Sequence, residues 1–170
     1  MGLLQPPYRI NSESRESLMP GLFIGADHRG FEKKNKLLAA LAHIEDFPLE
    51  TFDLGPYTYI KDDDYNDIAV TVSRSVLRNP NSFGVLLCGS GVGVSIQANR
   101  MKGIRAFVAN NPAVVKLARE HNDANIICLS ADNLTVEDIV AAIRIFISTK
   151  FSGAARHARR NSRLDEDIKL

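Results

Sequence analysis

The sequence contains little cysteine, no tryptophan and no long apolar run. Its two cysteines, Cys88 and Cys128, lack Cys-x-x-Cys spacing and are too few for a disulfide framework in a chain of 170 residues. Both end apolar runs, where a reduced and buried thiol is common, so we expect a reducing compartment, the cytoplasm. No apolar stretch reaches the ~18 residues that a helical membrane span needs, so we predict no membrane span.

An excess of charge of one sign is also missing. The chain carries 21 basic and 20 acidic side chains, which give a formal net charge of +1. We therefore predict neither a nucleic-acid partner nor an anionic membrane partner, because both need a strongly basic surface. His, Cys, Asp and Glu are not grouped at the spacing of metal ligands, so we predict no metal and no other cofactor. Any anion site in this chain has to be built locally.

The chain has the length of one domain. Residues 1–20 are rich in proline, serine and charge and lack the apolar core of a secretory signal, so we interpret them as a flexible extension. Residues 21–163 then form the domain, and residues 164–170 form a polar C-terminal tail. A domain of this size buries a substantial core.

Short apolar runs alternate with segments of helical periodicity along the whole domain. The apolar runs show no polar alternation, which is typical of parallel strands that helices cover on both faces. We therefore predict a single-domain, three-layer, doubly wound α/β fold with a five-stranded parallel sheet. Such folds bind ligands beyond the carboxyl ends of the strands. The expected strands are residues 22–26, 48–55, 83–88, 104–109 and 124–130, and the expected helices are 27–44, with Asp27 as N-cap, 62–77, 91–101, 112–121 and 136–149.

Residues 88–93, with the sequence CGSGVG, join the third strand to its helix. Glycine at alternate positions lets backbone amides approach a ligand, and a helix N-terminus favours anions. A dinucleotide fingerprint needs glycine where Val94 stands, and a Walker loop needs Gly-Lys before Ser or Thr, so neither motif fits. The segment therefore predicts a short oxyanion or phosphate cradle, to which Ser90 adds a hydroxyl donor.

Cys88, at the edge of this cradle, has two interpretations. Cysteine statistics favour a small core residue at a strand end. A neighbouring helix N-terminus favours the thiolate over the thiol, and a glycine turn leaves the strand end open. We favour a chemical role for Cys88 because of this loop.

Histidines and arginines supply further candidates. His28 follows the first strand, and its simpler interpretation is a surface residue. His121 ends the fourth helix, and its simpler interpretation is a histidine that the helix dipole favours at a C-terminus. Arg156 and Arg160 lie in the segment RHARR and share one face if that segment is helical. Two guanidinium groups on one face suit a phosphomonoester, although a solvated tail is the simpler interpretation.

Taken together, five segments resemble the ribose-5-phosphate isomerase B family, which includes isomerases of galactose 6-phosphate and allose 6-phosphate. The segments are GADHRGFEKK, DYND, LLCGSGVGVSIQANRMKGIRA, LAREHNDANII and RHARR, and they occur in the family's order across residues 21–163. The resemblance implies a metal-free aldose–ketose isomerase of the pentose phosphate pathway. It interconverts ribose 5-phosphate and ribulose 5-phosphate through a cis-enediolate.

The resemblance also implies a role for each candidate residue. Cys88 matches the base that moves a proton between neighbouring carbons, and relatives that use a glutamate instead place it where Val94 stands here. Asp27 and His121 match the residues that open the furanose ring. Ser90 and the loop amides, those of Gly89, Gly91 and Gly93 included, match the group that holds the enediolate oxygen. Substrate contacts are implied for His28, Tyr65, Asn99, Asn122, Arg156 and Arg160.

The family pocket joins two subunits, so the resemblance implies a homodimer with shared active sites, and pairs of dimers as a tetramer. The chain departs from the family pattern at Asp67 and Ile68, where relatives often carry histidine and tyrosine. It departs again at Asp132, where many carry an arginine that contacts phosphate. Two alternatives therefore stay open: an isomerase of a six-carbon sugar phosphate, and a catalytically silent sugar-phosphate-binding module.

Overall fold

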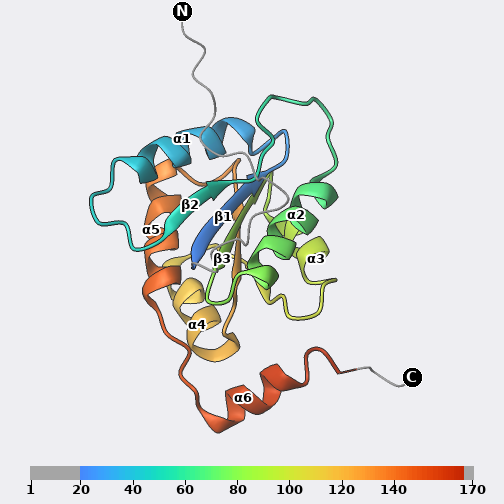
Figure 1. Ribbon diagram of the computed structural model, residues 1–170, viewed down its shortest axis with the longest axis vertical. Coiled ribbons are helices and arrows are strands. Elements are labelled where there is room, and N and C mark those ends of the chain that lie inside the picture. The colour runs from blue at the N-terminus through green and yellow to red at the C-terminus, as the bar shows by residue number, and fades with distance from the viewer. Residues whose placement is uncertain (1–19, 167–170) are drawn as a thin grey trace, which may run out of the picture.

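A computed structural model describes residues 20–166 (Figure 1). Five parallel strands form one sheet in the order β2-β1-β3-β5-β4. The predicted single-domain, three-layer α/β fold is confirmed. In chain order the elements are β1 (Gly21–Ala26), α1 (Phe31–Ala42), β2 (Glu50–Asp53), α2 (Tyr65–Arg78), β3 (Phe83–Cys88), α3 (Val92–Ala98), β4 (Ala106–Val108), α4 (Pro112–Asn122), β5 (Ile126–Ser130), α5 (Val136–Ser148) and α6 (Ala155–Ser162).

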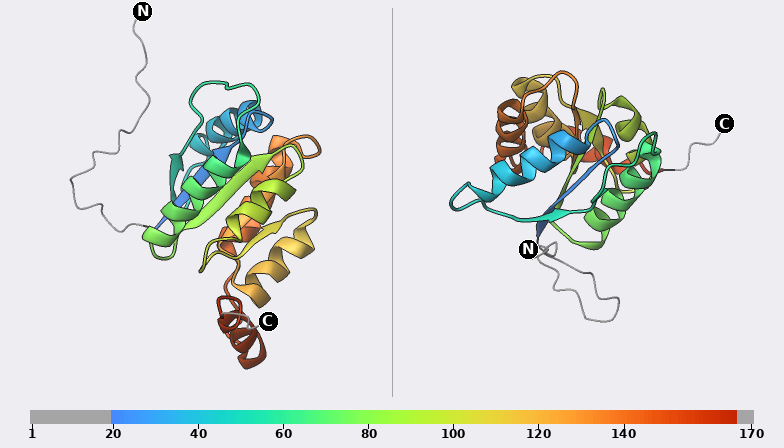
Figure 2. Two further views of the ribbon diagram at one scale, coloured as in Figure 1. Left: turned by 90° about the vertical axis from the view of Figure 1, so that its right-hand side faces the viewer. Right: turned by 90° about the horizontal axis from the view of Figure 1, so that it is seen from above.

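Helices cover both faces of the sheet (Figure 2), which explains why the central strands are apolar without alternation. On one face α1, α4 and α5 pack against a core that includes Val85 and Leu87 of β3. On the other face α2 and α3 pack against a core that includes Leu86 and Cys88 of the same strand. Successive residues of β3 are therefore buried on opposite sides.

A charged pair fixes the end of β2 against α1. The Lys34 side chain is fully buried, and its Nζ lies 2.7 and 2.8 Å from the two carboxylate oxygens of Asp53. Asp53 also accepts a hydrogen bond from the amide of Gly55. A buried lysine needs such a partner, because an unpaired charge in the interior is strongly destabilising. The pair thus holds the start of the loop that leads to α2.

The final helix lies apart from the sheet (Figure 1). α6 contacts the C-terminal end of α4, where the rings of His121 and His157 stack with centroids 4.1 Å apart. Asn161 donates a hydrogen bond to the carbonyl of His121 at the same place. The RHARR segment lies within α6 and is helical, as its predicted clustering of Arg156 and Arg160 on one face requires.

Most elements begin or end a few residues from their predicted boundaries, and the differences at α1, α3 and β4 lie next to candidate site residues. α1 begins at Phe31 with Gly30 as N-cap, so the prediction that Asp27 is the N-cap is wrong. A side chain at Gly30 would collide with the Leu87 carbonyl, and this tight turn delays the helix. α3 ends at Ala98, because the Asn99 side chain pairs instead with the backbone of Ala106, and β4 is only three residues long.

The predicted N-terminal extension lies outside the described residues, apart from Pro20, and so do residues 167–170. Within residues 20–166, no helix is long and apolar enough to cross a membrane.

Substitution of Phe146 tests the packing of the core beneath α5. Its ring is fully buried and lies 5.1 Å from the ring of Phe83 and 5.8 Å from that of Phe107. We expect Phe146→Ala to lower the free energy of unfolding by about 3–5 kcal/mol, because it leaves a cavity. Urea denaturation followed by circular dichroism measures this loss. The control, Leu77→Ala at an exposed position of α2, should cost less than about 1 kcal/mol; equal losses would contradict the assignment.

Candidate active site

Three loops meet at the carboxyl edge of the sheet. The Asp27 amide, after β1, donates to the carbonyl of Leu87 in β3 at 3.1 Å. The Ala131 amide, after β5, donates to the carbonyl of Cys88 at 2.9 Å. The hydroxyl of Ser130 donates to the carbonyl of Gly89 at 2.7 Å. The loop after β3 is therefore held by its neighbours on both sides.

The glycine loop has the tight form that its sequence requires. Gly91 has a φ of 81° and is the N-cap of α3; a side chain there would also press on the backbone of Leu129 at 3.3 Å. The Gly91 amide donates a hydrogen bond to the sulfur of Cys88 at 3.1 Å. The exposed Ser90 accepts a bond from the Val92 amide through Oγ, which leaves the hydroxyl hydrogen available for another acceptor. The loop thus points the Gly91 amide at the Cys88 sulfur and exposes the hydroxyl of Ser90.

Cys88 is more enclosed than the glycine turn led us to expect. Its exposed fraction is 5%, because it belongs to the core between the sheet and the α2 and α3 helices. The expectation that the turn leaves the strand end open is therefore wrong for a single chain. Cys128, two residues back on the neighbouring strand, is fully buried, and burial raises its pKa strongly. Both sulfurs are free thiols, and Cys88 is the one at the end of its strand.

Asp27 is a buried carboxyl group at the same edge. Its exposed fraction is 5%, and burial raises its pKa above the ordinary value. One carboxylate oxygen accepts the Gly30 amide at 3.0 Å, which fixes the side chain within its own turn. Burial therefore favours the neutral form of this carboxyl group, and a carboxyl group in a site is a candidate general acid or base.

His28 is held by an acidic partner from the loop before α2. One oxygen of Asp63 accepts both the His28 backbone amide at 2.7 Å and the ring Nδ1 at 2.8 Å. The hydrogen bond to Asp63 raises the pKa of the imidazole. His28 is thus oriented through one ring nitrogen, and its cationic form is favoured.

Tyr65, the first residue of α2, lies against the glycine loop. A side chain at Gly93 would come within 2.8 Å of its ring, so the ring rests directly on the backbone there. Two of the three residues that depart from the pattern of the resembled family follow Tyr65 in the first turn of α2. Ile68 packs over Gly25 and the core, and Asp67 is exposed on the first turn of α2.

The remaining predicted residues lie at the opposite edge of the sheet. A helix that follows a parallel strand returns the chain to the amino edge, so the C-terminal end of α4 lies at the edge opposite to the end of β3, where Cys88 stands. α6 is attached to that end of α4, and the Asn99 amide is bonded to the first residue of β4. The structure therefore divides the predicted site into two groups. The carboxyl-edge group is Asp27, His28, Tyr65, Cys88, Gly89, Ser90, Gly91 and Gly93, and the amino-edge group is Asn99, His121, Asn122, Arg156 and Arg160.

The amino-edge group is strongly cationic. Arg156 donates through Nε to Nε2 of His157 at 3.2 Å. Burial lowers the pKa of His157, and the nearby His121, Arg156 and Arg160 lower it further. A neutral His157 both accepts from Arg156 and stacks on His121, which holds those two side chains in place.

Comparison with known families matches residues 22–164 to the ribose/galactose isomerase family. The chain belongs to this family. Curated relatives include the probable ribose-5-phosphate isomerase B of Mycoplasma pneumoniae, 38% identical over 82% of this chain and 89% of the relative. The ribose-5-phosphate isomerase B of Mycobacterium tuberculosis strain H37Rv is 35% identical over 82% of this chain and 84% of the relative.

Solved structures of the ribose/galactose isomerase family share the fold. Ribose 5-phosphate isomerase from Thermotoga maritima is 40% identical, with a TM-score of 0.79 over 87% of this chain and 99% of that one. Ribose-5-phosphate isomerase B from Mycoplasma genitalium, solved with bound ribulose-5-phosphate, is 34% identical, with a TM-score of 0.77 over 85% of this chain and 93% of that one.

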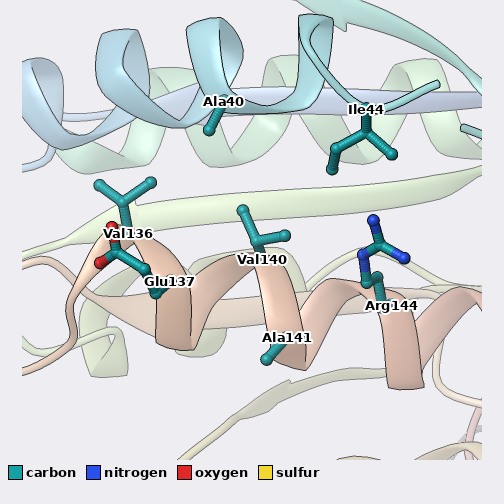
Figure 3. A pocket seen from close by; sticks show the side chains of 7 residues that line it. All are labelled: Ala40, Ile44, Val136, Glu137, Val140, Ala141 and Arg144. Carbon is teal, nitrogen blue, oxygen red and sulfur yellow. The ribbon is translucent and has the colours of Figure 1, made fainter.

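One groove on this family member lies away from the predicted site. A groove of about 390 Å³ lies between α1 and α5 (Figure 3) and shares no residue with the predicted site. Its lining is mainly aliphatic: Ala40, Ile44, Val136, Glu137, Val140, Ala141 and Arg144. Among residues 20–166, no three His, Cys, Asp or Glu side chains gather where they could hold a metal ion.

Sequence reasoning missed two residues beside the site of this isomerase-family chain. Asp63 is one of three consecutive aspartates, residues 62–64, that precede α2. Arg29 follows His28 directly and forms an ion pair with Asp132. The position of Arg29 within GADHRG was a usable signal, whereas nothing in the sequence distinguishes Asp63 from its neighbours.

The contact between Asp63 and His28 sets the charge of the imidazole. We expect Asp63→Asn to lower the pKa of His28 toward its ordinary value of 6.5, because the anionic acceptor is lost. The imidazole is then less protonated at pH 7. NMR titration of the ring, assigned with a His28→Gln variant, measures the shift. Asp62→Asn is the matched control, since it removes the same charge one residue away, where the carboxylate faces Lys61; equal shifts in both variants would contradict the contact.

Proposed function

We propose that the protein interconverts ribose 5-phosphate and ribulose 5-phosphate through a cis-enediolate, as an enzyme of the pentose phosphate pathway. The relatives named as ribose-5-phosphate isomerase B, and the related structure with bound ribulose-5-phosphate, support this substrate. The observation that carries the chemistry is the juxtaposition of Cys88, the amide donors of its loop and the buried Asp27 at one sheet edge. We place the reaction in the cytoplasm, where two free thiols persist.

Isomerisation moves one proton between neighbouring carbons and leaves the redox state of the whole sugar unchanged. Cys88, as thiolate, removes the proton next to the carbonyl of the open-chain sugar and returns it to the adjacent carbon. Negative charge develops on the substrate oxygen in between. The Ser90 hydroxyl and the loop amides are fixed donors for that oxygen, and such a donor is typically worth ~3 kcal/mol to the barrier.

A ribose 5-phosphate molecule that binds in its furanose form must first be opened. This ring opening requires a proton to be taken from the anomeric hydroxyl and another to be given to the ring oxygen. Asp27 suits this exchange because it is a carboxyl group at the same sheet edge as Cys88, and burial raises its pKa, which favours its protonated form. We assign His121 as the second group in ring opening.

A second copy of the chain is needed to complete this site. The single chain holds Cys88 and His121 at opposite edges of the sheet, so one subunit does not bring them to the same sugar. In a two-fold dimer, the amino edge of one copy faces the carboxyl edge of the other at two equivalent places. We propose this dimer as the minimum active unit, with Asn99, Asn122, Arg156 and Arg160 supplied by the partner, and a tetramer as a pair of such dimers.

Pentose phosphate is favoured over a six-carbon sugar phosphate and over binding without catalysis. The relatives that support the proposal are named as isomerases of ribose 5-phosphate, a pentose phosphate. The departures at Asp67 and Ile68 lie beyond Tyr65 rather than at the thiol. A silent binding module has no need of a thiol and a buried carboxyl group at the same edge.

Cys88→Ala tests the base. We expect the variant to lose more than about 1,000-fold in turnover of ribose 5-phosphate and in solvent deuterium exchange into ribulose 5-phosphate, because no other base stands in the loop. Titration calorimetry should show that ribulose 5-phosphate still binds. Cys128→Ala is the matched control: it removes a thiol from the same core cluster and should keep most of the turnover. Exchange at the wild-type rate in Cys88→Ala would show that another group is the base.

Mixing two inactive variants tests the shared site. A heterodimer of Cys88→Ala and His121→Ala subunits contains one site with both substitutions and one with neither. Random reassortment of equal amounts should therefore restore about a quarter of the wild-type turnover. Cys88→Ala mixed with Ser90→Ala is the control: both changes lie in the same edge group, so neither heterodimer site is intact. No recovery in the first mixture, with heterodimers shown by native mass spectrometry, would place each site within one subunit.

A further inference from the structure

The side chain of Arg29 covers the first residue of the glycine loop. A Cβ on Gly89 would lie 2.7 Å from Nε of Arg29 and 2.8 Å from Cζ, so the guanidinium group rests directly on the Gly89 backbone. Any larger residue at position 89 would push it away. The position of this cation is therefore tied to the loop that also carries Cys88 and Ser90.

Asp132 fixes the other end of this arrangement. Its carboxylate forms an ion pair with Nη2 of Arg29, and its backbone amide donates to the carbonyl of Gly89 at 3.2 Å. Arg29 thus bridges the loop after β1 and the loop after β5, with the glycine loop between them. Exposed ion pairs contribute little to stability, so the pair serves mainly to orient the guanidinium group.

Most of the hydrogen-bonding capacity of Arg29 is unused. A guanidinium group has five N–H donors, and within residues 20–166 only the bond from Nη2 to Asp132 is formed. The side chain is 57% exposed, so these donors are open to solvent, and the guanidinium group lies over Gly89, the residue that follows the buried Cys88. A fixed planar fork with free donors fits the oxygens of a phosphate group.

We propose that Arg29 is a further substrate-binding residue, which contacts the phosphate group of the sugar phosphate from the subunit that carries Cys88. This inference rests on the proposed function for the identity of the substrate. The cation lies at the outer rim, whereas the thiol is enclosed, so Arg29 meets the charged end of the substrate rather than the reacting carbons. His28, its neighbour in the chain, turns toward Asp63 on the α2 side, and Arg29 turns toward Asp132 on the α5 side.

Three substitutions of Arg29 separate its charge from its packing. Arg29→Ala removes both, Arg29→Met keeps an aliphatic cover over Gly89 without the charge, and Arg29→Lys keeps a charge without the fork. We expect the Kd of inorganic phosphate, measured by titration calorimetry, to rise about tenfold in the Ala and Met variants and less in the Lys variant. The KM for ribose 5-phosphate should rise in the same order, with kcat within about threefold of wild type, because a contact at the phosphate acts equally on ground and transition states.

The control is Arg74→Ala, an exposed arginine on α2 that should leave both constants unchanged. Wild-type values in Arg29→Met would overturn the inference, since they would reduce Arg29 to a packing role. A fall in kcat without a change in KM or in phosphate binding would overturn it as well. If the wild-type protein does not isomerise ribose 5-phosphate, the proposed function fails, yet the phosphate titration still decides the role of Arg29.

Discussion

The peptide group of Gly89 is the fixed point on which the candidate site depends. Its carbonyl accepts bonds from the Ser130 hydroxyl and from the Asp132 amide, and the carbonyl before it accepts from Ala131. All three donors come from the end of β5, the strand that pairs with β3. Parallel pairing thus brings the two strand ends together, and the bonds between their loops prevent the glycine loop from turning. Donors that are already fixed need no reorganisation when charge develops on a ligand.

The same topology explains why one chain holds only half of the proposed site. Every crossover helix carries the chain back to the amino edge of the sheet, so the residues at the end of α4 cannot approach the glycine loop of their own subunit. α6 is fastened to that same end by the stacked rings of His121 and His157. The stacked histidines hold α6 against the end of α4, just as the hydrogen bonds to Gly89 hold the glycine loop against the end of β5. In the proposed dimer, this contact would present His121 and the arginines of α6 together to the second copy.

Apolar runs without polar alternation predicted the three layers and the parallel sheet, because β1, β3 and β5 are enclosed by helices on both sides and contain almost no polar residues. Features that depend on contacts between distant loops were beyond sequence reasoning. Asp27 looks like a helix cap, but the close approach of Gly30 to β3 moves the helix start to Phe31. The pairing of Arg29 with Asp132 joins residues more than a hundred positions apart. Only the fold brings their two loops together.

The two edges of the sheet differ in how their cationic side chains are paired. At the carboxyl edge the cations are balanced, since His28 and Arg29 each face a carboxylate. At the amino edge of the described chain, Arg156 and Arg160 face no carboxylate within ion-pair distance, and the pKa of the adjacent His157 is lowered by their charge and by burial. A dianionic phosphate relieves this repulsion most when both edges meet around it. In the proposed dimer the substrate then stabilises the contact between subunits, and the contact in turn completes the binding site.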